Sequence, residues 1–142
     1  MFRQGEAWLH LAHSNNKVAG FQLEAAIQSA HCHAALSGQT DWLLLQQFYT
    51  ALINIAPTLG AKVSLAVTLG KTEGPQAALR YLDSLDCATI RRFQPWWATR
   101  AEMLKQTGHN EQAQAAYLKA SSLTTDQRAR QYLQHQAAQL KI

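Results

Sequence analysis

The sequence predicts an all-α chain assembled from repeated helix hairpins, and three observations lead to this prediction. Residues that favour helices, chiefly Ala, Leu and Gln, are abundant, whereas β-branched residues do not cluster. Apolar residues recur at three- and four-residue spacing along most of the chain. One stretch with the pattern of a helix hairpin also recurs at intervals of about 34 residues. No segment has the alternating pattern of a strand.

The repeat pattern is clearest in residues 97–123, where two short amphipathic helices are expected to fold back on each other around Gly108. Their apolar positions are Trp97, Ala101 and Leu104 on the first helix and Ala113, Tyr117, Ala120 and Leu123 on the second. Small residues where two helices cross, with a large aromatic beside them, are typical of a tight αα-hairpin. The pattern is that of the tetratricopeptide repeat (TPR), W-x2-L-G-x2-Y…A-x3-F, with Tyr117 in place of Phe. It departs from that pattern at Arg100, Ala101, Leu104 and Thr125.

The same pattern occurs twice upstream. About 35 residues earlier it falls on Leu65, Ala66 and Leu69, then on Ala78, Leu82 and Leu85; about 33 residues before that it falls on Leu45, Tyr49, Leu52 and Pro57. We therefore expect a single domain, residues 1–142, that forms a TPR-like α-α superhelix with about three repeats at residues 26–58, 59–93 and 94–125. An N-terminal helix precedes them, and a C-terminal helix at 126–141 covers the last apolar face, as an open solenoid requires. The alternative is an irregular helical bundle with chance periodicity.

Turn-forming residues set the expected ends of the first helices. A short helix is expected within residues 5–13, followed by a loop at residues 14–17. The second helix spans residues 21–36 and ends at Ser37-Gly38; one of its faces carries Leu23, Ile27 and Ala30 or Ala34. The third spans residues 42–56, with Thr40 or Asp41 as its N-cap and Pro57 as its stop.

The remaining helices have equally local signals. The fourth spans about residues 60–69, and the fifth begins at Pro75, where the missing N–H costs nothing, and ends near Leu85. Pro95 opens the sixth helix and Glu111 lies near the start of the seventh. Thr125-Asp126 caps an eighth helix that continues to about residue 140.

The net charge of +4 is unevenly distributed along the chain. Residues 1–86 carry five basic and six acidic side chains, whereas residues 87–142 carry eight basic and three acidic ones. A basic half can attract nucleic acid or an acidic protein surface. The longest run of adjacent basic residues is Arg91-Arg92, so solvated helix surface is the favoured interpretation and direct nucleic-acid binding is not expected of this domain alone.

Composition also limits the compartment. The longest apolar run is far shorter than a membrane span, and the N-terminus lacks an apolar signal core. Cys32 and Cys87 are far apart in the sequence and are interpreted as two reduced thiols. These features predict a cytoplasmic protein without a membrane partner.

No catalytic, nucleotide-binding or zinc motif occurs, so we expect no enzyme activity, no metal and no cofactor. His31 and His33 would point about 200° apart on a helix and could not bind one metal ion. His10 and His13 lack a third ligand at suitable spacing. We expect His31 to face a helix–helix contact.

Two sets of residues are candidates for binding. Trp97 takes the packed position of the repeat, so its neighbour Trp96 is either exposed at a protein interface beside Arg91, Arg92 and Arg100, or packed on the preceding repeat. Glu102 and Lys105 complete this candidate interaction surface. The second set lines the concave groove expected of a TPR: Ala30, Ala34, Val63, Val67 and Ala98. That groove is apolar and lacks the basic cluster with which TPRs bind a peptide carboxylate.

A series of short segments resembles the C-terminal TPR-containing domain of a group of extracytoplasmic-function RNA polymerase sigma factors. The segments are QLEAAIQSAH (22–31), TDW (40–42), YTAL (49–52), Ala56-Pro57, GPQAAL (74–79), ATRAEML (98–104) and AAYLKA (115–120). Each is weak alone, but their order and spacing are specific, and together they cover about residues 20–135.

The resemblance implies a bacterial, cytoplasmic regulatory domain that acts on sigma regions 2 and 4 or on core RNA polymerase. Residues 1–142 leave no room for either sigma region, so we do not expect this chain alone to recognise a promoter. Family members carry an Asn-Arg pair where this sequence has Ser64 and Leu65, which puts the function of that pair in doubt here. The matching residues are His31, Asp41, Trp42, Gly74, Pro75, Arg100 and Ala101. Arg100 is expected to make a polar contact, either with a partner carboxylate or within the repeat.

Two other functions stay open. One is a stand-alone TPR scaffold or a sensor for a small ligand or peptide, bound in the groove between Val63, Val67 and Ala98. The other is direct DNA binding through the basic half of the chain.

Overall fold

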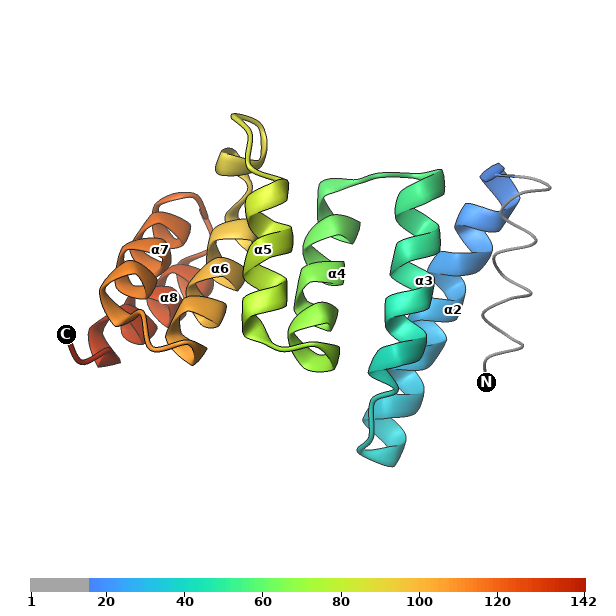
Figure 1. The fold of residues 1–142 in the computed structure, drawn as a ribbon, viewed down its shortest axis with the longest axis horizontal. Coiled ribbons are helices and arrows are strands. Elements are labelled where there is room, and N and C mark those ends of the chain that lie inside the picture. Colours follow the sequence, from blue (N-terminus) through green and yellow to red (C-terminus); the bar gives the residue numbers. More distant parts are fainter. Residues whose placement is uncertain (1–15) are drawn as a thin grey trace. The chain divides into compact units, whose positions relative to one another are not determined.

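The computed structural model describes residues 16–142, and this part of the chain consists of seven α-helices and one short 3-10 helix, with no strand (Figure 1). The helices are α2 (Asn16–Ser37), α3 (Trp42–Ile55), α4 (Leu59–Thr72), α5 (Pro75–Ser84), η1 (Ile90–Arg92), α6 (Gln94–Gln106), α7 (Asn110–Ser122) and α8 (Gln127–Gln139). The all-α prediction is confirmed for these residues. The helix expected within residues 5–13, with His10 and His13, lies outside the described residues.

The described residues fall into two compact units that divide at Thr68, inside α4. In the N-terminal unit α2 and α3 run antiparallel and pack along their length (Figure 1). Leu23 and Ile27 of α2 pack there against a face of α3 and the first turns of α4. The buried residues of this core are Leu23, Ile27, Leu45, Phe48, Ala51, Leu52 and Ala61.

Local signals placed the ends of α3 correctly. The Asp41 carboxylate accepts a hydrogen bond from the Leu44 backbone N–H at 3.1 Å, which satisfies one of the free donors in the first turn. The helix ends at Ile55 with Ala56 as its C-cap, because Pro57 disfavours helical geometry in the residue that precedes it.

Helix α2 is longer than the sequence predicts. It includes Asn16 and Lys17, both assigned to a loop on composition, and it passes through Gly20 without interruption. Gly20 lies near Ile55 of α3, so that a Cβ added there would lie 3.8 Å from the Ile55 side chain. Burial of Ala19 and Leu23 outweighs the low helix propensity of the preceding polar residues and of Gly20.

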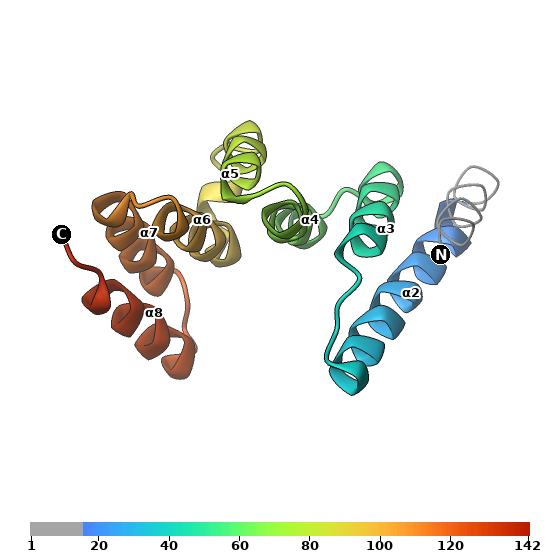
Figure 2. The ribbon, with the colours of Figure 1, turned by 60° about the horizontal axis from the view of Figure 1, so that its bottom comes forward.

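In the C-terminal unit, α5, α6, α7 and α8 alternate in direction and each packs on the next (Figures 1 and 2). The main core of this unit lies between α6, α7 and α8. Its buried residues are Ala101, Leu104, Ala113, Ala116, Tyr117, Ala120, Leu133 and Ala137. The alanines let the helix axes approach closely, as expected where helices cross. The prediction that Ala101, Ala113, Tyr117 and Ala120 face one another is confirmed.

Glycines reverse the chain between helices of this unit. Gly108 has φ +84 between α6 and α7, and Gly74 has φ +106 immediately before α5. Side chains other than glycine rarely adopt this left-handed region. Pro75 then occupies the first turn of α5, as predicted.

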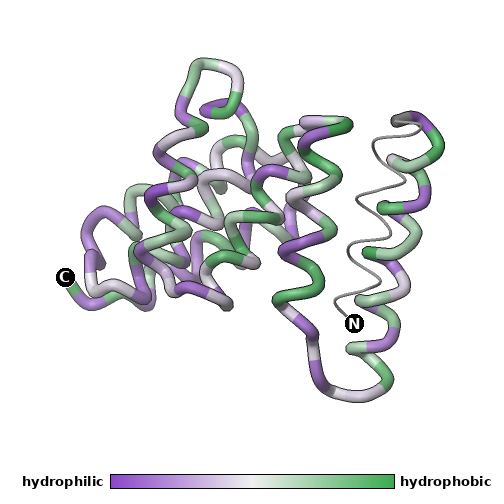
Figure 3. Tube along the Cα trace, turned by 45° about the vertical axis from the view of Figure 1, so that its right-hand side comes forward, coloured by the Kyte–Doolittle hydropathy of each residue, from purple (hydrophilic) through white to green (hydrophobic). Residues whose placement is uncertain are grey.

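The distribution of apolar residues along the helices and a short 3-10 helix complete the description of the fold. Hydrophobic and hydrophilic residues alternate along the helices (Figure 3), and none of the helices within residues 16–142 combines the length and apolar character needed to cross a membrane. The 3-10 helix η1 was not predicted, since its three residues carry no periodic signal; burial of Ile90 fixes it to the unit.

Candidate functional site

Four of the six predicted interaction residues lie at one corner of the C-terminal unit, where α5 ends, η1 follows and α6 begins. Arg91 and Arg92 lie on η1, whereas Trp96 and Arg100 lie on the first two turns of α6. Pro95 in the first turn of α6 fixes the helix start, and the Phe93 carbonyl oxygen accepts a hydrogen bond from the Trp96 N–H at 3.1 Å. We call this region the α5–α6 corner.

Trp96 is part of the core, so the alternative in which it is exposed at an interface is wrong. Its side chain is 2% exposed, and its indole Nε1 donates a hydrogen bond to the Leu82 carbonyl oxygen of α5 at 3.1 Å. The physical reason is that α6 has neighbours on two sides: α5 packs on one face and α7 on another. Trp96 therefore packs against the preceding helix, and its role as a partner-binding residue is withdrawn.

Trp97, assigned to the packed position, is only partly buried. It contacts the α6–α7–α8 core from its edge, and its Nε1 donates a hydrogen bond to the Arg91 carbonyl oxygen at 2.8 Å. The Trp96 and Trp97 rings meet edge to face, with centroids 4.9 Å apart and an angle of 85° between their planes. The two indoles thus tie η1 and α6 to the end of α5.

Two ion pairs close the corner on its outer side. The Arg91 guanidinium donates two hydrogen bonds to the Asp86 carboxylate, from Nε at 2.7 Å and from Nη2 at 2.8 Å. This bidentate hydrogen bonding lowers the pKa of Asp86 below its ordinary value. Arg91 therefore has an intramolecular partner, and a competing protein carboxylate would have to displace Asp86.

Arg100 makes an intramolecular polar contact, but with the preceding predicted repeat (59–93) and not within its own (94–125). Its guanidinium pairs with the carboxylate of Asp83 in the last turn of α5 and lies over the Trp96 ring, 5.5 Å from the centroid. A carboxylate near the C-terminus of a helix is unfavourable beside the helix dipole, and Arg100 offsets this. Arg100 therefore positions α5 against α6.

The last turns of α6 carry a second polar cluster, centred on Glu102. Tyr117 of α7 donates a hydrogen bond to Glu102 at 2.7 Å, and Gln106 donates one at 3.2 Å. Partial burial alone would raise the pKa of Glu102, but these hydrogen bonds and the nearby Lys105 lower it. Burial and the bond to Glu102 raise the pKa of Tyr117. Lys105 also contacts Gln136 of α8 at 3.4 Å.

Among the six predicted interaction residues, Arg92 differs from the others because the structure records no hydrogen bond from its side chain to another described residue, and it is exposed. The other charged members hold helices together. Exposed ion pairs contribute little to stability because water screens them, so their main effect is to fix the geometry of the corner.

The predicted groove residues are distributed over both units. Ala30, Ala34, Val63 and Val67 belong to the N-terminal unit and Ala98 to the C-terminal unit. Val63 is 5% exposed and therefore acts as a core residue, whereas Ala98 packs at the edge of the α6–α7–α8 core. A groove shared by all five stays a prediction.

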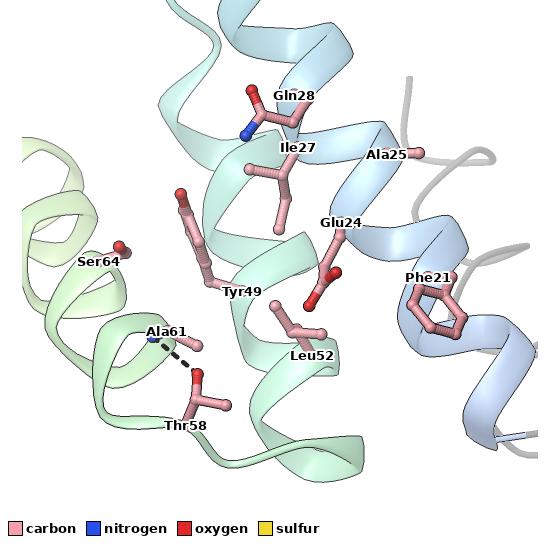
Figure 4. Close-up of a pocket in the computed structure, with 10 residues that line it drawn as sticks. All are labelled: Phe21, Glu24, Ala25, Ile27, Gln28, Tyr49, Leu52, Thr58, Ala61 and Ser64. Carbon is pink, nitrogen blue, oxygen red and sulfur yellow. Dashed lines mark hydrogen bonds between the residues drawn. The ribbon is translucent and has the colours of Figure 1, made fainter.

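The N-terminal unit instead contains a pocket that the sequence did not predict. It has a volume of about 480 Å³ and opens between α2, α3 and the start of α4 (Figure 4). Its lining residues are Phe21, Glu24, Ala25, Ile27, Gln28, Tyr49, Leu52, Thr58, Ala61 and Ser64. Ser64, one of the two positions that depart from the sigma-factor pattern, lies at its α4 wall.

Next to this pocket, His31 of α2 contacts the Tyr49 hydroxyl of α3 at 3.3 Å. The prediction that His31 faces a helix–helix contact is confirmed. Within the described residues no group of three or more His, Cys, Asp or Glu side chains is arranged to hold a metal ion. Both cysteines are free thiols on the surface.

Residues 16–142 form an all-α structure in which α2 packs on α3 in one unit and α5, α6, α7 and α8 pack in succession in the other. No family model and no solved structure matches it. The chain is 29% identical over 136 residues to the uncharacterized protein R00370 of Rhizobium meliloti (strain 1021). The match covers 96% of this chain and 32% of that protein, so the chain spans about a third of the length of its relative.

Proposed function

We propose that this chain is a non-catalytic regulatory module with a TPR-like superhelix that controls an RNA polymerase sigma factor of the extracytoplasmic-function group. Its partners are sigma regions, core RNA polymerase, or both, and it acts in the cytoplasm. The observation that carries this proposal is the ordered series of segments that resembles such regulatory domains over about residues 20–135.

The positions of those segments on the helices support the proposal. The segment at 40–42 supplies the N-cap and first residue of α3, and that at 74–79 supplies the turn and first residues of α5. The segments at 98–104 and 115–120 form the facing stretches of α6 and α7 that bury Ala101 and Tyr117. Residues that resemble the family thus coincide with residues that determine helix ends and helix packing.

The helix order also supports a TPR-like arrangement. The pairs α2–α3, α4–α5 and α6–α7 correspond to the three expected repeats, and α8 corresponds to the C-terminal cap. Helix α8 buries Leu133 and Ala137 and exposes mostly polar residues. A polar outer face is what the terminal helix of an open solenoid requires.

The length of the relative is compatible with a module inside a longer protein. About two thirds of the Rhizobium meliloti protein lies outside the match. In our proposal, sigma regions 2 and 4 occupy the remainder of a protein of this kind, and the module contacts them there.

The experiment measures binding of the purified 142-residue chain to two immobilised partners at low salt. The partners are bacterial core RNA polymerase and a polypeptide with regions 2 and 4 of an extracytoplasmic-function sigma factor. Arg92→Glu reverses an exposed charge at the α5–α6 corner and is expected to weaken binding several-fold. Arg128→Glu, at an exposed position on α8, is the matched control and is expected to bind as the unmodified chain does.

Trp96→Ala is unsuitable for this test, because Trp96 is buried and its loss would weaken the fold itself. The absence of binding to either partner at low salt would contradict the proposal. If Arg92→Glu and Arg128→Glu weakened binding equally, the α5–α6 corner would be excluded as the interaction surface. The proposed partner would be unaffected by that result.

A further inference from the structure

We propose that the pocket between α2, α3 and α4 binds an organic cation with an apolar body, such as an alkylammonium, arylammonium or guanidinium group. This inference goes beyond the regulatory role proposed above and does not depend on it. All ten lining residues belong to the N-terminal unit.

The size and shape of the pocket suit a small ligand or one inserted side chain. Its volume of about 480 Å³ lies within the range of about 300–1,000 Å³ that is usual for ligand sites. Ile27, Leu52 and Ala61, which belong to the core of the unit, supply apolar lining surface. A preformed core beneath the pocket reduces the cost of ordering it on binding.

The charge of the lining selects a cation. Glu24 is the one charged residue among the ten that line the pocket, and its carboxylate points into the space between α2 and α3 (Figure 4). Within the described residues no Lys or Arg forms an ion pair with Glu24. An ammonium or guanidinium group placed there would form a charge-assisted hydrogen bond.

Polar and aromatic groups around Glu24 complete the site. Gln28 lies one helical turn further along α2, and Tyr49 lines the pocket from α3 (Figure 4). Phe21, at its edge, is 67% exposed, which is unusual for a large aromatic side chain. Aromatic faces attract cations electrostatically, so Phe21 and Tyr49 favour the same class of ligand as Glu24.

This ligand chemistry has two sources: a free organic amine, or a basic side chain presented by a peptide segment. The test uses the ¹⁵N-labelled 142-residue chain and follows backbone amide shifts during titration. The free probe is phenethylammonium, with 2-phenylethanol as its neutral analogue and 3-phenylpropionate as its anionic one. The peptide probe is a capped pentapeptide with one Arg between leucines, compared with the same peptide carrying Gln.

The expected result is a set of shifts confined to amides of residues around 24, 28, 49, 61 and 64. For the free probe the expected Kd is about 1–10 mM, as its small number of atoms allows. The neutral and anionic analogues are expected to bind at least about threefold more weakly. Added salt is expected to weaken the binding of the cation but not that of the neutral analogue. Tighter binding of the Arg peptide identifies a peptide segment as the source, and tighter binding of the amine identifies a free ligand.

Two variants test the role of Glu24. Glu24→Gln is expected to raise Kd about three- to tenfold, whereas Glu111→Gln, at an exposed position on α7, leaves it unchanged. Gln28→Lys places an ammonium four residues after Glu24 on the same helix, where the two form an internal ion pair. This variant keeps the helix stable and is expected to abolish the cation-specific shifts.

The proposal fails if the cation and its neutral analogue shift the same amides equally, or if neither shifts any amide around the pocket at about 10 mM. It also fails if Glu24→Gln and Glu111→Gln give equal Kd values. None of these three failures bears on binding of polymerase or sigma regions through the C-terminal unit, so the two proposals are distinguishable.

Discussion

The indole Nε1 of Trp96 donates a hydrogen bond to the carbonyl oxygen of Leu82, 3.1 Å away, and joins the first turn of α6 to the last turn of α5. Both residues are buried, Leu82 completely. The same carbonyl oxygen also accepts the Leu85 N–H at the end of α5. One contact therefore fixes both the end of a helix and its packing on the next, and makes Trp96 a structural residue of the C-terminal unit.

Replacing each of the two adjacent tryptophans by phenylalanine should separate their roles. Trp96→Phe loses the bond to Leu82 and part of a buried ring, and is expected to lower the free energy of unfolding by about 1–3 kcal/mol. Trp97→Phe affects a partly exposed ring and is expected to cost less than about 1 kcal/mol. Urea unfolding followed by far-UV circular dichroism measures both. Equal losses would show that burial does not distinguish the two positions.

For Trp96 the sequence left two alternatives open, exposure at an interface or packing on the preceding repeat, and the structure shows the second. The repeat pattern assigns one packed face to each helix, and Trp97, Ala101 and Leu104 do face α7 and α8. Helix α6 has a second covered face, with Trp96 toward α5 and Met103 against Gly70 of α4. The seven-residue spacing of Trp96 and Met103 was the available signal for it. Periodicity identifies apolar faces, but it does not reveal how many neighbours a helix has.

Helix ends were predictable because their causes are local. Asp41 and Asp126 accept backbone hydrogen bonds at the starts of α3 and α8, and Pro75 begins α5, each as expected from residues a few positions apart. The pocket beside Glu24 was not predictable, since it depends on which positions of three helices are left uncovered after packing. Similarly, the ion pairs of Arg91 and Arg100 depend on how η1 turns the chain between α5 and α6.

The Arg100–Asp83 pair should contribute modestly and should respond to salt. The side chains of Arg100 and Asp83 are 25% and 60% exposed, so solvent screens the attraction between their charges. A double-mutant cycle with Arg100→Gln and Asp83→Asn is expected to give a coupling energy of about 0.5–1 kcal/mol. Unfolding midpoints at two salt concentrations measure it, and the coupling should shrink at the higher one. Arg100→Lys should recover less than the full coupling, because Lys lacks the planar group that lies over Trp96.

The turn between α6 and α7 should tolerate only glycine at its centre. Gly108 has φ +84, so Gly108→Ala forces a side chain into left-handed geometry and is expected to cost about 1–2 kcal/mol. Gly60→Ala is the control, because Gly60 is helical and a Cβ there meets no atom within 4 Å. That variant is expected to be neutral or to stabilise by up to about 1 kcal/mol. Thermal unfolding of the two variants gives the comparison, and a loss shared equally by both would exclude backbone geometry as the cause.

The Glu102–Tyr117 bond should make the stability of the chain depend on pH at both extremes. Glu102 has a lowered pKa in the folded state, so its contribution is present above about pH 4.3, its ordinary pKa, and is lost as pH falls below it. Tyr117 has a raised pKa, so its contribution is present below about pH 10 and is lost as the unfolded phenol ionises above it.

Comparison with Tyr117→Phe isolates this bond, since the phenylalanine ring keeps the packing and lacks the hydroxyl. Between about pH 6 and 9 the variant is expected to be less stable by about 1–2 kcal/mol. This energy is lower than that of a fully buried hydrogen bond to a carboxylate, because Glu102 is partly exposed. The difference should shrink below about pH 4 and above about pH 10. Tyr81, whose pKa is raised by burial, is present in both proteins and cancels in the difference. Urea unfolding across this pH range measures the effect, and a difference that stays constant at both extremes would mean that the hydrogen bond does not carry the pH dependence.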